Sequence, residues 1–173
     1  QGEEIQTGIH RWLKNKLPKG WQHQIKNDVI INYQLNDEKK LFKTVKGFLL
    51  NGTAEARLGT LHDRISGGMN FMIGNFNDPY QKGKRKKIEY YLYGQSRINF
   101  IGYDATMQGG LFNRKSPYTI AVGDISRVTF QADAGLIFNF RKLYLSYTQS
   151  FLTKEFRTGR YHRWGGFSFG FSF

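Results

Sequence analysis

Gln6 and His10, near the amino end of the chain, are the pair of residues best suited to acid–base chemistry. They stand four positions apart, so a helix would place both on one face. The spacing of the apolar residues predicts such a helix over residues 3–15. A neutral imidazole near pH 7 is suited to accepting a proton, and a histidine satisfied within the helix is the alternative interpretation.

Metal chemistry is not predicted from this sequence. The other histidines are His23, His62 and His162, and no pair has the His-x-x-x-His spacing of a zinc site. We expect His62 and His162 to be solvated, in a turn and in a loop. The chain has no cysteine, which excludes disulfides and thiolate ligands.

The secondary structure of the rest of the chain is predicted by a strict alternation of apolar and polar residues, which is typical of β-strands. It is clearest over residues 164–173, where Phe167, Phe169, Phe171 and Phe173 share one side of an extended chain. Such a row would promote aggregation in water but suits a lipid-facing wall. The pattern looks like the last strand of an outer-membrane β-barrel, and the edge strand of a soluble sandwich is the alternative.

The same alternation predicts about seven strands, and the fold class is therefore all-β, a transmembrane antiparallel outer-membrane β-barrel. The six strands upstream are expected at residues 24–35, 42–58, 64–74, 88–101, 126–138 and 143–156. A polar turn is expected at 36–40, and the longest loop at 102–125. Single-chain bacterial barrels usually have an even number of strands. We therefore expect that strands before Gln1 are missing, or that another chain closes the barrel.

The formal net charge of +13 limits the choice of partner. No nucleic-acid motif is present, and the basic residues are spread along the chain, so we expect no nucleic acid. A phosphorylated glycolipid of the outer leaflet is the anionic partner that suits a barrel, and ordinary solvated rims are the alternative. The candidate phosphate-binding residues lie in loops: Arg114, Lys115, Arg157 and Arg160.

Several motifs in order carry a resemblance to a known family. Gln6 and His10 are followed by Gly20-Trp21 and then by Gln24-Ile25-Lys26-Asn27, and the sequence Thr-Lys-Glu-Phe stands at 153–156. In this order they resemble the lipid A 3′-O-deacylase family of outer-membrane enzymes. The similarity covers essentially all of this chain, which corresponds to the C-terminal part of a family member.

The resemblance implies a twelve-stranded barrel in the bacterial outer membrane, of which these would be the last seven strands. It implies that His10 is the general base that hydrolyses an acyloxyacyl ester of lipid A, and that Gln6 lines the pocket. The single barrel domain would span 1–173, with a helix and connector on the extracellular side at 1–22 and strands at 23–173. The substrate would be lipopolysaccharide.

Ca²⁺ is the cofactor that the resemblance implies, because some members carry a Glu linked to calcium six residues after the histidine. Here that position is Lys16, which puts a calcium requirement in doubt. This departure favours an alternative function, a non-catalytic barrel of the same family that serves as a structural or partner subunit with other outer-membrane proteins. The retained Gln6 and His10 favour the esterase.

Overall fold

The computed structural model describes residues 29–41, 46–82, 86–112 and 119–171. Their regular elements are mostly strands, which confirms the predicted all-β class and the predicted number of strands. The strands are β1 (Asn32–Lys40), β2 (Phe48–Gly59), β3 (His62–Asn75), β4 (Ile88–Asp104), β5 (Val128–Phe140), β6 (Leu143–Leu152) and β7 (His162–Phe171). The helical segments are α2 (Ala105–Gln108) and the 3-10 helix η1 (Val122–Asp124).

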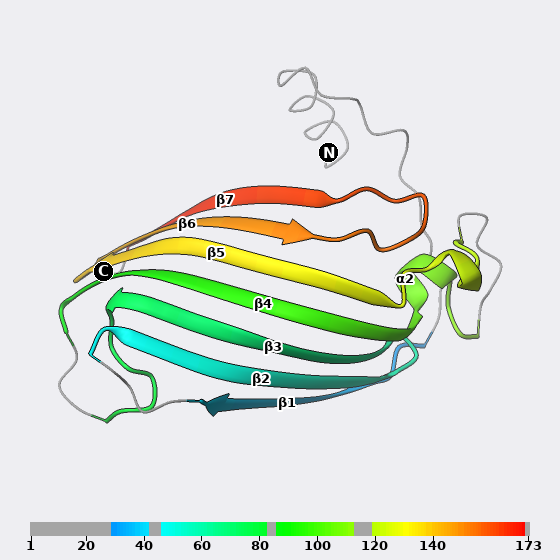
Figure 1. The fold of residues 1–173 in the computed structure, drawn as a ribbon, viewed down its shortest axis with the longest axis horizontal. Coiled ribbons are helices and arrows are strands. Elements are labelled where there is room, and N and C mark those ends of the chain that lie inside the picture. Colours follow the sequence, from blue (N-terminus) through cyan, green and yellow to red (C-terminus); the bar gives the residue numbers. More distant parts are fainter. Residues whose placement is uncertain (1–28, 42–45, 83–85, 113–118, 172–173) are drawn as a thin grey trace, which may run out of the picture.

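The seven strands form one antiparallel sheet in which the spatial order is the sequence order, β1 to β7 (Figure 1). Each strand therefore pairs with its neighbour in the chain, as short connections favour. Residues 60–61, 105–127 and 153–161 connect strands at one end, which we call the loop end. Residues 41–47, 76–87 and 141–142 connect them at the other, which we call the turn end; β7 also finishes there.

The pairing register carries the alternation of the sequence across the whole sheet. One row of paired residues, running from β2 to β6, is entirely polar: Asn51, Asn70, Gln95, Asp133 and Ser150. A row on the opposite face, running from β3 to β7, is apolar and aromatic: Ile73, Leu92, Leu136, Tyr147 and Phe167. We call these the polar face and the apolar face. Phe167, Phe169 and Phe171, which were predicted to share one side of the last strand, lie on the apolar face.

Burial in this sheet is inverted relative to a water-soluble protein. The most buried polar residues include Ser66, Asn99 and Thr129, each no more than 3% exposed. On the apolar face Phe167 is 85% exposed and Phe169 is 73% exposed. A wall with this distribution is stable where hydrocarbon contacts the apolar face.

Two glycines accommodate aromatic rings from the neighbouring strand. Gly94 pairs with Phe71, and a Cβ at position 94 would lie 2.2 Å from the phenyl ring. Gly135 pairs with Tyr93, whose ring would lie 2.5 Å from a Cβ at position 135. The rings therefore cover backbone that would otherwise be bare, and each glycine is needed for this close approach.

The predicted polar turn at 36–40 is wrong, because these residues continue β1 and pair with β2 as far as Lys40 opposite Asn51. Asn36, Glu38 and Lys40 lie on the polar face, where charge is tolerated. The outward residues Asp37 and Lys39 form an exposed ion pair at 3.6 Å near the turn end. A run of polar residues such as 36–40 can therefore continue a strand where that strand approaches the membrane boundary.

Other boundaries moved by several residues. The first predicted strand starts in residues 24–28, outside the described residues, and residues 29–31 precede β1 without strand pairing. The second strand begins at Phe48 instead of 42, and the sixth ends at Leu152 instead of 156. None of the helical segments in the described part of the chain has the length and apolar composition of a membrane-spanning helix.

Candidate functional site at the loop end

The long connection between β4 and β5 packs tightly against the ends of the strands. Asp104 ends β4 and caps α2 by accepting a hydrogen bond from the Thr106 amide at 2.9 Å. The Ala105 amide donates to the Leu61 carbonyl at 2.9 Å, and the Tyr103 hydroxyl donates to the Gly109 carbonyl at 2.6 Å. Ala105 is only 1% exposed, so the start of this connection is an ordered part of the loop end.

His62 lies next to Asp104, the residue that caps α2. The register places it opposite Asp104, and its Nδ1 lies 3.4 Å from the Asp104 Oδ1. The predicted solvated turn histidine is therefore the first residue of β3, with a carboxylate neighbour. Because that carboxylate also caps α2, the pair ties the 60–61 turn to the long connection.

A small cleft of about 80 Å³ opens beside this pair. Its titratable lining residues include His62, Arg64, Asp104 and Glu155. The cleft holds donors and acceptors but is much smaller than an ordinary substrate pocket. Its arrangement can position loops and bind water-sized polar groups.

Below the cleft, a chain of hydrogen bonds crosses three strands on the polar face. The Ser66 hydroxyl donates to the side-chain oxygen of Asn99 at 2.8 Å, and the side-chain amide of Asn99 donates to the Thr129 hydroxyl at 3.1 Å. All three residues are buried. A buried polar network with its partners satisfied makes this part of the wall rigid.

Glu55 is the centre of an ion-pair cluster on the same face. One of its carboxylate oxygens lies 2.8 Å from the Arg64 Nη2 and 3.0 Å from the Arg57 Nε. Glu89, on the same face, accepts hydrogen bonds from Asn77 and Asn139. The polar face therefore carries charges of both signs, and Glu55 compensates two arginines at once.

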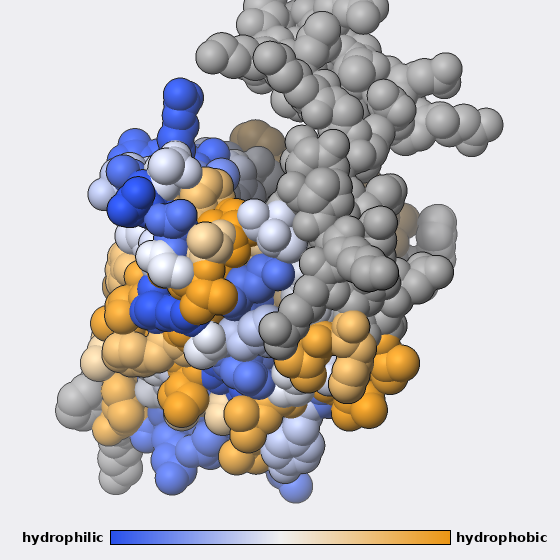
Figure 2. All heavy atoms as spheres, turned by 90° about the vertical axis from the view of Figure 1, so that its right-hand side faces the viewer, coloured by the Kyte–Doolittle hydropathy of each residue, from blue (hydrophilic) through white to orange (hydrophobic). Residues whose placement is uncertain are grey.

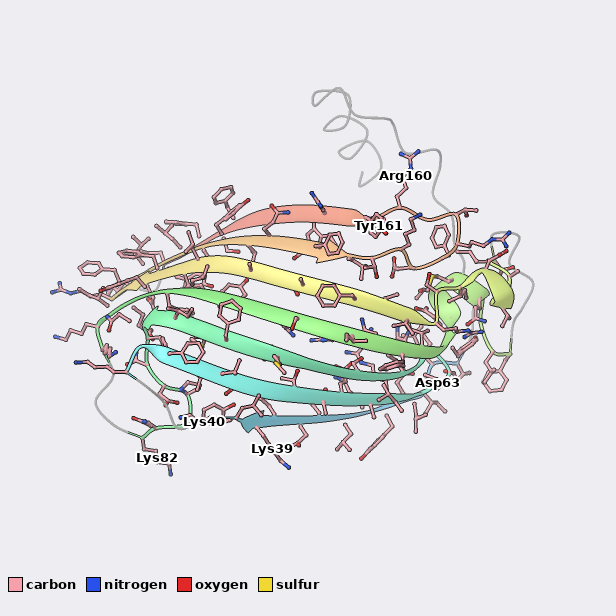
Figure 3. All side chains as sticks on the ribbon, in the orientation of Figure 1. Lys39, Lys40, Asp63, Lys82, Arg160 and Tyr161 are labelled. Atoms are coloured by element: carbon pink, nitrogen blue, oxygen red, sulfur yellow. The ribbon has the colours of Figure 1, made fainter. Side chains whose placement is uncertain are left out.

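Two of the predicted lipid-binding residues lie at the loop end, in the connection between β6 and β7. The Arg157 Nε lies 3.3 Å from the Asp124 Oδ1, and 80% of the Arg157 side chain is exposed. Arg160 is exposed and has no ion pair with any described residue; Figure 3 shows it near Tyr161, projecting from the connection. The structure thus places both cations at the loop end.

The remaining predicted site residues are Gln6, His10, Arg114 and Lys115, and they lie outside the described residues. Within the described ranges, no group of three or more His, Cys, Asp or Glu side chains could hold a metal ion. Asp104 was not among the site residues predicted from the sequence. The sequence feature that could have indicated it is an Asp directly before Ala105-Thr106, because Asp is a common N-cap residue at the start of a helical turn.

Viewed from the loop end, the surface carries hydrophobic and hydrophilic residues side by side, with hydrophobic residues at its left and lower right margins (Figure 2). An antiparallel wall with one apolar face, one polar face and elaborate loops at one end defines a protein of the outer-membrane β-barrel class. The comparisons with known proteins agree with this class.

The model of the family Outer membrane protein LpxR matches residues 1–173, and the chain belongs to this family. A solved structure described as LpxR from Salmonella typhimurium is similar, with a TM-score of 0.71 and 20% sequence identity. The similarity covers 99% of this chain and 62% of that chain. A search of curated proteins found no match. The predicted family, barrel fold and outer-membrane localisation are thereby confirmed.

Proposed function

We propose that the protein is a lipid A deacylase-like esterase that hydrolyses an acyloxyacyl ester of lipid A in the outer leaflet. His10 is the general base in this proposal, and Gln6 lines the pocket. The cations of the loop connections bind the phosphates of the substrate: Arg114, Lys115, Arg157 and Arg160.

The observation that carries this proposal is the family match over the whole chain, because it includes the Gln6 and His10 motif. The arrangement of the loop end supports it. Arg157 and Arg160 are exposed at the end that carries the longer connections, which in outer-membrane barrels faces outward. Arginine is suited to phosphate because its planar guanidinium can donate two parallel hydrogen bonds.

The chemistry needs one proton acceptor. The His10 imidazole takes a proton from a water or hydroxyl, whose oxygen then attacks the ester carbonyl carbon. When the carbon–oxygen ester bond breaks, the imidazolium returns the proton to the departing alkoxide. The products are a free acyloxyacyl acid and lipid A with the freed hydroxyl. Where a protein hydroxyl attacks first, a water then hydrolyses the acyl-enzyme ester with the same proton transfers.

The test is mass spectrometry of lipid A from cells that express the intact protein or a His10→Ala variant. We expect loss of one acyloxyacyl group with the unchanged protein and full acylation with His10→Ala. A His162→Ala variant is the matched control and should retain activity. Equal amounts of folded protein in the outer membrane must be verified by heat-modifiable electrophoretic mobility. Full acylation with the unchanged protein would contradict the esterase.

Lys16 favours a second candidate, a non-catalytic barrel of the same family that acts as a structural or partner subunit. In that case lipid A stays unchanged, and a defined outer-membrane protein should co-purify with the barrel after chemical cross-linking. A dependence on calcium would further distinguish the esterase from the non-catalytic barrel. If an active enzyme lost activity on addition of a chelator, the family's calcium requirement would hold despite Lys16.

We also propose that further strands, from the same polypeptide or another chain, cover the open edges of the sheet. Among the described residues, β1 and β7 each pair with one neighbour. An uncovered strand edge exposes backbone N–H and C=O groups, which hydrocarbon cannot satisfy. Electrophoresis without heating tests the proposal. The sheet should resist unfolding in detergent when the covering strands are present, and the 173-residue chain alone should not.

A further inference from the structure

The apolar face of β4–β7 is layered at the turn end. The register aligns three tiers of four side chains, one from each strand. From the turn end inward, they are Ile88, Phe140, Leu143 and Phe171; Tyr90, Phe138, Leu145 and Phe169; and Leu92, Leu136, Tyr147 and Phe167. The tiers form a continuous apolar surface next to the turn end.

A hollow of about 640 Å³ lies in this surface. It is lined mainly by the second and third tiers, and Ile73 of β3 extends it sideways. Tyr147 and Phe167 contact each other at one margin, with their rings tilted by 38° and their centroids 4.7 Å apart. The hollow is within the usual range of ligand sites, about 300–1,000 Å³, and its lining suits hydrocarbon.

Cationic side chains stand directly beyond the first tier. The Arg141 amide donates to the Lys87 carbonyl at 3.0 Å, which brings the two connections together. The Arg141 guanidinium lies 5.3 Å from the centroid of Phe140 in the first tier. Lys87 and Lys142 are exposed, and neither forms an ion pair within the described part of the chain. We call Lys87, Arg141 and Lys142 the cationic rim.

The rim belongs to a surplus of positive charge at the turn end, where Figure 3 shows Lys39, Lys40 and Lys82. Two carboxylates at the turn end are already occupied: Asp78 pairs with Lys40 at 2.9 Å, and Glu89 accepts two hydrogen bonds on the polar face. The loop end differs, because its cations alternate with acids such as Asp124 and Glu155. Only the turn end therefore combines an apolar hollow with uncompensated cations among the described residues.

We propose that the hollow and the cationic rim together bind one anionic phospholipid of the phosphatidylglycerol type. An acyl chain occupies the hollow, and the phosphate contacts Lys87, Arg141 and Lys142. Since the longer connections face outward, this lipid belongs to the periplasmic leaflet. The site is separate from the proposed esterase, which acts at the loop end, and each can fail without the other.

Native mass spectrometry of the intact protein in detergent tests this, with added dioleoyl phosphatidylglycerol as the probe. We expect one tightly retained lipid. Its retention should fall about fivefold for each rim charge removed, as for cations beside an anionic membrane surface. The informative variants are Lys87→Gln, Lys142→Gln and Arg141→Asn. Asparagine suits position 141 because Arg141 has a φ of 53°.

Two further variants separate specific binding from general attraction. Leu136→Trp keeps every charge but fills the hollow, and it should also reduce retention. The control, Lys154→Gln with Arg163→Gln, removes two exposed cations at the loop end and should have no effect. Lys87→Gln leaves the 141–142 turn intact, so a folding defect at Arg141 does not decide the result.

Equal retention in the rim variants and the control would overturn the proposal. Equal retention of dioleoyl phosphatidylethanolamine, which is zwitterionic, would also overturn it, because the rim would then contribute no selectivity. Stronger competition by lipopolysaccharide than by phosphatidylglycerol would reject the assigned leaflet and lipid.

Discussion

Replacing Glu55 by Gln should destabilise the barrel, because this carboxylate compensates two arginines on the polar face. The substitution preserves shape but removes the charge. The Glu55 side chain is 13% exposed, and those of Arg57 and Arg64 are 31% and 23% exposed. Gln34 also donates to Glu55, at 3.2 Å, so the carboxylate is held from three sides.

The magnitude follows from the remaining solvent contact. Removing one partner of a fully buried ion pair costs about 3–5 kcal/mol, whereas an exposed pair contributes about 0–1 kcal/mol. The arginines keep part of their solvent exposure, and glutamine still accepts one hydrogen bond. We therefore expect a loss of about 2 kcal/mol in the free energy of unfolding.

The assay is urea unfolding of the intact protein in phospholipid vesicles, followed by tryptophan fluorescence. Asp37→Asn is the matched control, because it removes a carboxylate from an exposed pair with Lys39. It should change stability by less than about 0.5 kcal/mol. A second substitution, Arg64→Gln in the Glu55→Gln background, should recover part of the loss. Equal effects of Glu55→Gln and Asp37→Asn would refute the compensation argument.

Three other predictions follow from local geometry. Gly94→Ala should destabilise by about 1–3 kcal/mol, because its Cβ would meet the Phe71 ring, whereas Gly67→Ala, with no atom within 4 Å, should be nearly neutral in the same urea assay. Asn99→Ala should cost about 1–3 kcal/mol in urea unfolding because it leaves two buried hydroxyls without their shared partner, and an unchanged midpoint would contradict this. Partial burial and the hydrogen bond that Tyr80 donates to the Glu38 carboxylate raise the pKa of Tyr80. The protonated tyrosine therefore stabilises the folded state fully at a pH below the pKa of the unfolded state, and this contribution is lost as the pH rises through the pKa of the folded state. The difference in absorbance at alkaline pH between the unchanged protein and Tyr80→Phe should show late ionisation, and a midpoint at the ordinary tyrosine pKa would disprove it.

The number of strands and their facing could be predicted from the sequence because alternation has a period of two and recurs in every segment. The run Asn36-Asp37-Glu38-Lys39-Lys40 could not be assigned correctly, since polar residues mark both turns and strand ends outside the hydrocarbon. Pairing with β2 decided between them, and pairing is a long-range property.

The candidate site was predictable only in part. The loop positions of Arg157 and Arg160 followed from the polar connection, but the contact between His62 and Asp104 did not. These two residues are far apart in the chain and meet because a register shift near Asp63 and Arg64 sets the end of the β3–β4 pairing. No local pattern contains that information.

Hydrocarbon should surround the apolar face in a bilayer, and spin labels placed one at a time along β7 can measure this. The chain has no cysteine, so single-cysteine variants from position 165 to 171 label one site each. In phospholipid vesicles, labels at 167, 169 and 171 should collide with lipid-soluble oxygen, and labels at 166, 168 and 170 with a water-soluble nickel chelate. Loss of this alternation, or access of the chelate to 167 and 169, would contradict the account.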